Sequence, residues 1–149
     1  MEHKQLLTVF NSLPVGIGFF TADGTLVRCN ESFCRIFGAD SQTLLGNKLN
    51  INENSVVPDV VKEAVRRCVP VQMSFLYDFD KQRTDKRFFS TRTRTCYLKC
   101  NGNPLYDNDG KFVNYIFIFE DITETVKSEE VLRQSRRKTE LAMKAMYLP

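Results

Sequence analysis

Apolar and polar residues alternate with two different periods along the first 30 residues, and each period predicts a different element. Residues 6–13 carry apolar side chains at positions i, i+4 and i+7, which is typical of an amphipathic helix, and Pro14 ends that pattern. Residues 15–19 and 25–29 alternate with a period of two around an Asp-Gly turn. The chain therefore begins with a helix that is followed by a β-hairpin.

Short helices are expected after this hairpin, because capping and stop residues divide the next segment. Asn30 suits the start of a helix and Gly38 suits its C-terminal stop. Ser41 is expected to cap a second short helix, and Pro58 to occupy the first position of a third, longer one that ends near Cys68.

The period returns to two after Pro70 and predicts three further strands. We expect a half-buried strand over residues 70–79, a charged turn over 81–87, and a Thr-rich aromatic strand over 88–100. Turn-forming residues around Pro104 then lead into a near-continuous apolar strand over 112–119. Asn101-Gly102 and Asn108-Asp109-Gly110 are the residues that bracket this expected turn.

The last segment, after Ile122, is helical and highly charged. Its heptad-like seam has a spacing of three and four and consists of Thr125, Ser128, Leu132, Ser135, Thr139, Ala142 and Met146. Large apolar residues are scarce in this seam, so it predicts a marginal coiled coil or a linker helix that needs a partner. Leu132, Ala142 and Met146 are the candidate dimer contacts.

Composition limits the chemistry that this chain supports. It has 149 residues, which is the size of a single domain, and it lacks tryptophan and has one histidine, His3. A net charge of +3 is too small to require a nucleic acid, and no apolar run approaches the length of a membrane span. The five cysteines are an odd, irregularly spaced set, which indicates reduced thiols in a cytoplasmic protein and no metal site.

Short motifs occur in a fixed order along residues 6–123. They are Leu13-Pro14-Val15-Gly16-Ile17, Asp23-Gly24, Cys29-Asn30-Glu31-Ser32-Phe33, Phe37-Gly38, Leu45-Gly46, Asn103-Pro104-Leu105, Asp109-Gly110-Lys111 and Glu120-Asp121-Ile122-Thr123. Together they resemble a PAS domain. The resemblance implies an α+β fold in which short helices pack on one face of a five-stranded antiparallel sheet. It also implies an N-terminal flanking helix over 1–12, the PAS domain over 13–123 and a C-terminal linker helix over 124–149.

The resemblance also implies a role in signalling. Asp121, Ile122 and Thr123 match the signature that closes PAS domains, where a change in the domain is passed to the output helix. Residues 140–146 resemble the helix that often opens another PAS domain, an arrangement common in bacterial sensor histidine kinases, including hybrid ones. We therefore expect a sensory and dimerisation module that forms a homodimer and relays its state to an adjacent PAS or kinase domain.

Two other functions compete with this expectation. The basic residues of the C-terminal helix and of the strand with Tyr97 would suit a nucleic-acid-binding regulatory domain, but four glutamates interrupt that helix, so we expect no nucleic-acid partner. A thiol enzyme using Cys34 or Cys68 would need a neighbouring base, and the sequence offers none. We expect no catalytic residue in this chain.

No cofactor is expected either. The helix that usually carries the haem-binding histidine in PAS domains has none here, and residues 49–55 lack the reactive cysteine of the flavin photoreceptors. This leaves a small organic ligand or a packed core, of which the packed core is favoured. Candidates for the interior are Phe33, Phe37, Val65, Met73, Phe75, Phe117 and Phe119.

The orientation of Arg92 and Arg94 is ambiguous. They share one side of an expected strand whose other side carries threonines, so neither side is cleanly apolar. A bulge could turn one arginine inward to pair with the carboxylate of a ligand. The favoured alternative places both arginines on a solvated face, since an unpaired buried guanidinium is costly.

Overall fold

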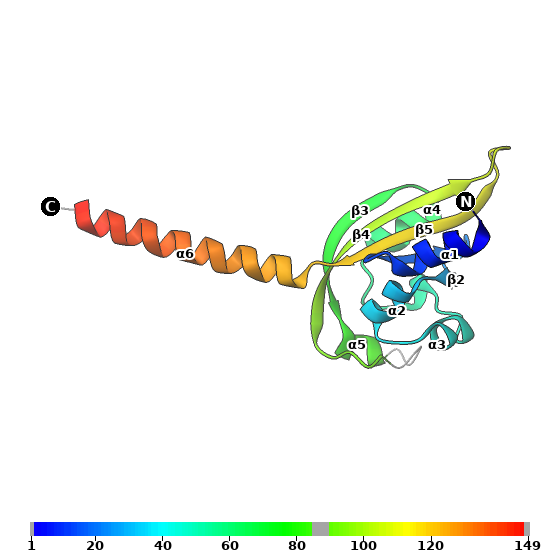
Figure 1. Cartoon of the computed structure of the whole chain (residues 1–149), viewed down its shortest axis with the longest axis horizontal. Coiled ribbons are helices and arrows are strands. Elements are labelled where there is room, and N and C mark those ends of the chain that lie inside the picture. Colours follow the sequence, from blue (N-terminus) through cyan, green and yellow to red (C-terminus); the bar gives the residue numbers. More distant parts are fainter. Residues whose placement is uncertain (1, 85–89, 148–149) are drawn as a thin grey trace.

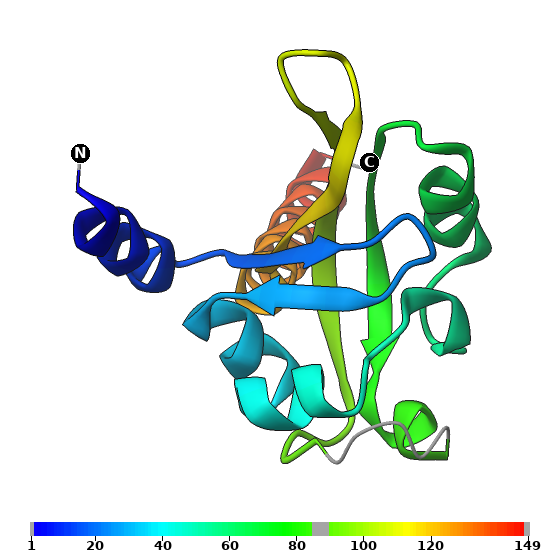
Figure 2. The same ribbon diagram turned by 90° about the vertical axis from the view of Figure 1, so that its right-hand side faces the viewer.

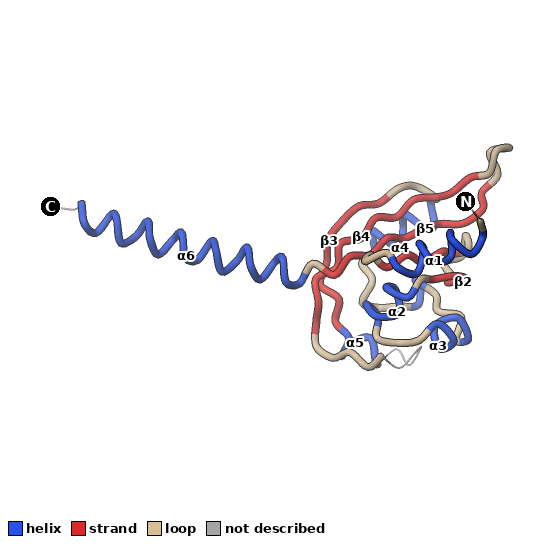
Figure 3. Tube along the Cα trace, viewed as in Figure 1, coloured by secondary structure: helices blue, strands red, loops and turns tan. Residues whose placement is uncertain are grey.

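Five antiparallel strands form the centre of the structure, a computed structural model that describes residues 2–84 and 90–147 (Figures 1 and 3). The strands lie in the order β2-β1-β5-β4-β3. Their bounds are β1 Gly16–Phe20, β2 Leu26–Cys29, β3 Val71–Asp78, β4 Thr95–Tyr106 and β5 Phe112–Asp121. The β4–β5 hairpin extends beyond the rest of the sheet (Figure 2).

Six α-helices and one 3₁₀ helix, η1, are present in the described part of the chain. Their bounds are α1 His3–Ser12, α2 Glu31–Phe37, α3 Ser41–Gly46, η1 Ile51–Glu53, α4 Asp59–Arg67, α5 Phe79–Thr84 and α6 Thr123–Tyr147. The expected α+β fold with its flanking helices is confirmed. Within residues 2–84 and 90–147, no helix combines the length and the apolar character that crossing a membrane requires.

The core lies between the short helices and one face of the sheet. Alternate residues of β5, namely Tyr115, Phe117 and Phe119, are buried, as its period of two requires. Phe33 of α2 and Val61 of α4 pack into the same cluster from the helical side. Burying one such side chain contributes about 1.5–3 kcal/mol, so these contacts fix the helices on the sheet.

Asn30 connects three elements at the start of α2, and its side chain is only 1% exposed. Its Oδ1 accepts hydrogen bonds from the backbone N–H of Phe33 at 3.0 Å, which caps α2, and from that of Ile17 in β1 at 2.9 Å. Its Nδ2 donates to the carbonyl oxygens of Phe10 and Val15, both at 2.9 Å. One amide therefore caps α2 and ties the end of α1 to the sheet.

Several expected boundaries differ from the observed ones. Asp40, not Ser41, caps α3, because its side chain accepts from the backbone N–H of Thr43. Pro58 is the N-cap of α4, which begins one residue later. The helix α5 occupies part of the expected charged turn over 81–87, and residues 85–89 lie outside the described part of the chain.

The largest difference concerns β4. This strand begins at Thr95, and not near residue 88, and it continues to Tyr106 through Asn101-Gly102 and Pro104, where the turn was expected to begin. Gly102 pairs with Val71 of β3 and with Phe117 of β5, so it lies in the middle of the sheet. A Cβ atom on Gly102 would lie 2.6 Å from the Phe117 ring, and a glycine is therefore required by packing, not by a turn.

Candidate functional site

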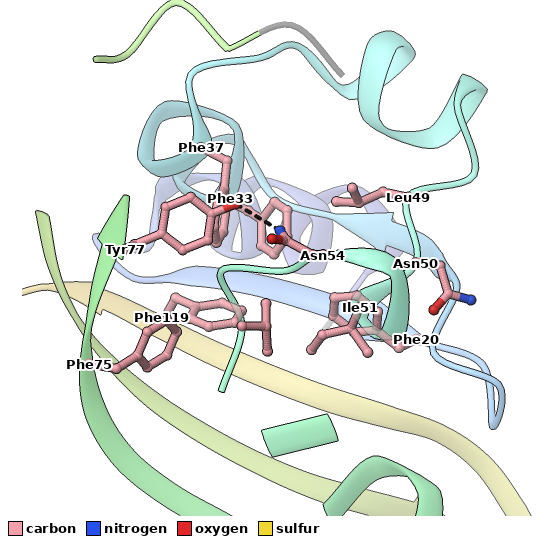
Figure 4. A pocket seen from close by; sticks show the side chains of 11 residues that line it. Phe20, Phe33, Phe37, Leu49, Asn50, Ile51, Asn54, Phe75, Tyr77 and Phe119 are labelled. Carbon is pink, nitrogen blue, oxygen red and sulfur yellow. Dashed lines mark hydrogen bonds between the residues drawn. The ribbon is translucent and has the colours of Figure 1, made fainter. Parts of the chain in front are cut away.

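A small cavity lies between α2, η1 and the sheet (Figure 4). Its volume is about 30 Å³, and its lining residues are Phe20, Phe33, Phe37, Leu49, Asn50, Ile51, Asn54, Val57, Phe75, Tyr77 and Phe119. A space of this size holds one or two water molecules, whereas sites for small organic ligands measure about 300–1,000 Å³.

Aromatic rings close most of this cavity. The ring of Phe37 lies 4.6 Å from that of Phe33, 5.4 Å from that of Tyr77 and 5.3 Å from that of Phe119, measured between centroids. Asn54 contributes the polar edge, since its Nδ2 donates to the Tyr77 hydroxyl at 2.8 Å (Figure 4). Its Oδ1 accepts from the backbone N–H of Val56, so both ends of the Asn54 amide have partners within the chain.

Four of the residues expected in the interior line this cavity: Phe33, Phe37, Phe75 and Phe119. Val65 and Phe117 are buried elsewhere in the core, and Met73 packs against its edge. The alternation of β3 and β5 indicates which face of each strand is buried, but not which part of that face borders the cavity. Asn54 and Tyr77 were not identified as site residues from the sequence. They form a recognisable buried polar pair only because the folded chain brings η1 beside β3.

Arg92 and Arg94 are not on a strand, so neither arrangement expected for them is found. Both precede β4, in a segment of residues 90–94 that we call the strap. The Arg92 guanidinium lies over the Phe79 ring, with its Cζ 4.7 Å from the ring centroid. Its Nη1 donates to the carbonyl oxygen of Ile36 at 2.9 Å and to Asp121 Oδ2 at 3.1 Å. Arg94 is exposed and has a φ of 64°.

The strap is also bonded to the end of α2. The Ser90 hydroxyl donates to the carbonyl oxygen of Phe37 at 2.7 Å, and the backbone N–H of Thr91 donates to that of Gly38 at 2.8 Å. Gly38 has a φ of 68°, and a Cβ atom there would lie 2.6 Å from Ser90 Oγ. The strap therefore rests directly on the C-terminus of α2.

Asp121, Ile122 and Thr123 form a bonded junction between β5 and α6. Asp121 Oδ1 accepts from the backbone N–H of Thr123 at 3.0 Å and from its hydroxyl at 2.5 Å. Thr123 Oγ1 in turn accepts from the backbone N–H of Tyr97 at 3.0 Å, and Ile122 donates its backbone N–H to the Tyr97 carbonyl at 2.9 Å. The first turn of α6 is thus attached to β4 as well as to β5.

Opposing effects act on the pKa of Asp121. Partial burial by itself raises this pKa, but the hydrogen bonds from Thr123 and the contact with the Arg92 guanidinium outweigh burial. The pKa of Asp121 is therefore lower than that of an ordinary aspartate, and its carboxylate is charged at neutral pH.

These contacts form a continuous connection from the cavity to α6. Phe37 lines the cavity, and its carbonyl oxygen is held by Ser90 of the strap. Arg92 of the same strap contacts Ile36 on one side and Asp121 on the other. The end of α2, the strap and Asp121 are therefore linked by direct hydrogen bonds, and Asp121 is bonded in turn to Thr123 of α6.

The helix α6 projects away from the rest of the domain (Figure 1). None of its 25 residues, all of which the structure describes, is buried. Leu132 is 51% exposed and Met146 is 78% exposed, and Ala142 is exposed as well. Its charges pair along the helix, as where Arg133 contacts Glu130 at 2.8 Å.

Comparison with known protein families identifies the domain. A family model described as the PAS fold matches residues 10–127. The chain belongs to the PAS family. This match covers the cavity, the strap and the Asp121–Thr123 junction, which are accordingly parts of a PAS domain. No curated protein matches the chain.

Solved structures show the same fold at low sequence identity. An RNA-binding light-oxygen-voltage receptor is 19% identical with a TM-score of 0.66; the match covers 90% of this chain but 37% of that protein. A PAS domain from Colwellia psychrerythraea is 16% identical with a TM-score of 0.60, covering 81% of this chain and 97% of that one. A domain of a sensory box histidine kinase/response regulator from Geobacter sulfurreducens is 15% identical with a TM-score of 0.54, covering 79% and 92%.

Proposed function

We propose that this PAS domain is the cytoplasmic input module of a sensor histidine kinase, and that it relays the state of its core through α6 as a homodimer. The observation that carries the proposal is the contrast between the bonded start of α6 and the exposure of the rest of this helix. Thr123, the first residue of α6, is bonded to β4 and to Asp121, which the strap contacts, whereas no residue of the helix is buried.

The exposure of α6 supports a partner helix. At 1.5 Å per residue its 25 residues extend about 37 Å, and helices in water obtain most of their stability from packing an apolar face. The seam that contains Leu132, Ala142 and Met146 is the face that a second copy would cover. Because several of its positions are serine or threonine, the paired helices would be held weakly. Weak pairing suits a relay, since a small change at the junction can then alter it.

The kinase assignment rests on relatedness of fold and on the sequence resemblance. The Geobacter sulfurreducens domain belongs to a sensory box histidine kinase/response regulator, and another solved relative is a PAS domain from a two-component sensor histidine kinase. In this proposal the chain performs no catalytic step itself. Its partners are the second copy and the PAS or kinase domain that α6 leads to.

The volume of the cavity supports a domain that senses without a resident cofactor. Haem or flavin would require the rings of Phe33, Phe37 and Phe75 to vacate the space that they fill, and the cavity is about 30 Å³. In this proposal, the sensed change alters how α2 packs against the sheet. The strap would carry that change to Asp121.

Sedimentation equilibrium of the full chain tests the dimer. We expect the wild type to associate, and the change Leu132→Asp to weaken the association at least tenfold, because it places a charge in the seam. Val131→Asp is the matched control: Val131 is also exposed and adjacent, but it lies outside the seam. A monomeric wild type, or equal effects of both changes, would refute the proposed dimer.

A nucleic-acid-binding role is less well supported. The light-oxygen-voltage receptor described as RNA-binding shares the fold at 19% identity, and α6 carries basic residues. Glutamates are interspersed among these residues, and Arg133 is engaged by Glu130. RNA binding that weakens steeply with salt and is abolished by Arg136→Glu would favour this function instead.

A further inference from the structure

Two cysteines lie side by side where β2 passes into α2. Cys29 is the last residue of β2 and Cys34 lies in α2, and their sulfur atoms are 3.9 Å apart. Both side chains are partly exposed, so small reagents can reach them. The other cysteines differ: Cys96 and Cys100 are buried, and Cys68 has its sulfur 3.6 Å from the Tyr106 hydroxyl.

We propose that Cys29 and Cys34 form a redox-sensitive dithiol that hydroperoxides convert into a disulfide and that thiol reductants restore. A disulfide needs a sulfur–sulfur distance of about 2.05 Å, so closing the pair requires the two sulfurs to approach by about 1.9 Å. Side-chain rotation and a small movement of the intervening backbone can supply this distance. The proposal is independent of α6 and of the relay.

The hydroperoxide is the oxidant that accepts the two electrons released when the disulfide forms. The thiolate of one cysteine attacks a peroxide oxygen, the O–O bond breaks, and the products are a sulfenic acid and, from hydrogen peroxide, a hydroxide that takes up the thiol proton to become water. The second thiol then attacks the sulfenic sulfur, the S–O bond breaks, and a second water leaves with that proton. Two sulfurs are each oxidised by one electron, and the peroxide is reduced by two.

The surroundings assign the order of attack and predict a slow reaction. Burial, followed by the neighbouring Cys34, raises the pKa of the Cys29 thiol to about 12. Burial also raises the pKa of Cys34, and Asp40 and Glu31 raise it further, but the hydrogen bond with the Cys29 thiol and the Arg35 guanidinium act in the opposite direction. Cys34 is therefore the attacking thiol and Cys29 the resolving one. Because the thiolate is the nucleophile, the rate should increase with pH above neutrality.

Asn30 links this pair to the N-terminal helix. It directly follows Cys29, caps α2, and holds Phe10 and Val15 through its Nδ2. Its four hydrogen bonds have lengths of 2.9–3.0 Å in the dithiol form. Drawing the two sulfurs together moves the backbone on both sides of Asn30, and the disulfide should therefore loosen the attachment of α1.

Mass spectrometry of the full chain tests the disulfide directly. Trypsin cleaves after Arg28 and after Arg35, so a single peptide, 29–35, contains both cysteines and no other. After treatment with hydrogen peroxide and then iodoacetamide, we expect this peptide to be unalkylated and lighter by two hydrogen atoms. Dithiothreitol should restore both alkylation sites. Peptide 29–35 alkylated at both cysteines after peroxide treatment, or cross-linked to a second chain, would overturn the proposal.

Single substitutions separate the two roles. In Cys29→Ser, Cys34 should stop at the sulfenic acid, which dimedone traps, whereas Cys34→Ser should leave Cys29 alkylatable. Cys68→Ser is the matched control, since it removes another partly exposed thiol and should leave the disulfide unchanged. For the effect on Asn30, we expect the backbone amides of Ile17 and Phe33, which donate to its Oδ1, to exchange several-fold faster in the disulfide form. Unchanged exchange would overturn the proposed effect on Asn30.

Discussion

Arg92 and Asp121 join the strap to the end of β5, just before α6, through a 3.1 Å contact, although 29 residues separate them in the chain. The Arg92 side chain is 31% exposed and the Asp121 side chain 28% exposed, so water screens the pair only in part. The same guanidinium also contacts the Ile36 carbonyl and the Phe79 ring. The Arg92 side chain therefore contacts α2, α5 and the junction at the same time.

We expect Arg92→Ala to lower the free energy of unfolding by about 1–3 kcal/mol, and Asp121→Asn to lower it by about 1 kcal/mol, because Asp121→Asn leaves two of the three Arg92 contacts in place. Urea unfolding of both variants and of the double variant gives the coupling energy of the pair. Arg94→Ala is the control, since it removes an exposed arginine of the same strap. Additive effects of the two substitutions would show that the pair is not coupled.

Acid should weaken the junction through Asp121. Its pKa in the folded protein lies below the value of about 3.9 for an unfolded chain, so its contribution to stability is complete above that value and is lost as the pH falls through the folded pKa. The difference in unfolding free energy between wild type and Asp121→Asn should therefore stay constant from neutral pH down to about pH 4 and shrink as the pH falls further. Asp23 and Asp40, whose pKa values are also lowered, are present in both proteins and cancel. A difference that stays constant with pH would contradict this assignment.

Local signals in the sequence were sufficient for most of the fold. Asn30 as a cap and Gly38 as a stop were predicted correctly, because each acts within its own helix. The turn expected between Asn101-Gly102 and Asn108-Asp109-Gly110 is found only at its second bracket, residues 107–110. Gly102 was misassigned because the need for it arises from rings of β5 that cross it, and those rings are remote in sequence. Arg92 was placed incorrectly for a similar reason: its partners Ile36 and Asp121 are known only from the tertiary structure.

The position of Gly102 beneath these rings gives a third prediction. A Cβ atom would lie 2.6 Å from Phe117 and 2.8 Å from Tyr115, whose hydroxyl is itself bonded to the Val69 carbonyl. Neither ring can withdraw freely, so Gly102→Ala should destabilise the protein by about 1–3 kcal/mol in thermal or urea unfolding. Gly46→Ala is the control, because nothing lies within 4 Å of its added Cβ and it belongs to a helix. We expect this control to be neutral or slightly stabilising. Equal stabilities of the two variants would rule out crowding at Gly102.

The small volume of the cavity gives the last prediction. With about 30 Å³ available, the wild type has no room for benzene, and its melting temperature should not change when benzene is added. Phe33→Ala removes a fully buried ring from the wall and should cost about 3–5 kcal/mol, and benzene should recover part of that loss by filling the new space. Phe33→Leu should be less destabilised and should gain less from benzene, which keeps the test informative if the alanine variant fails to fold. A melting temperature that rises with benzene in the wild type itself would mean that the interior opens to ligands, and the domain would then be a candidate sensor of small apolar molecules.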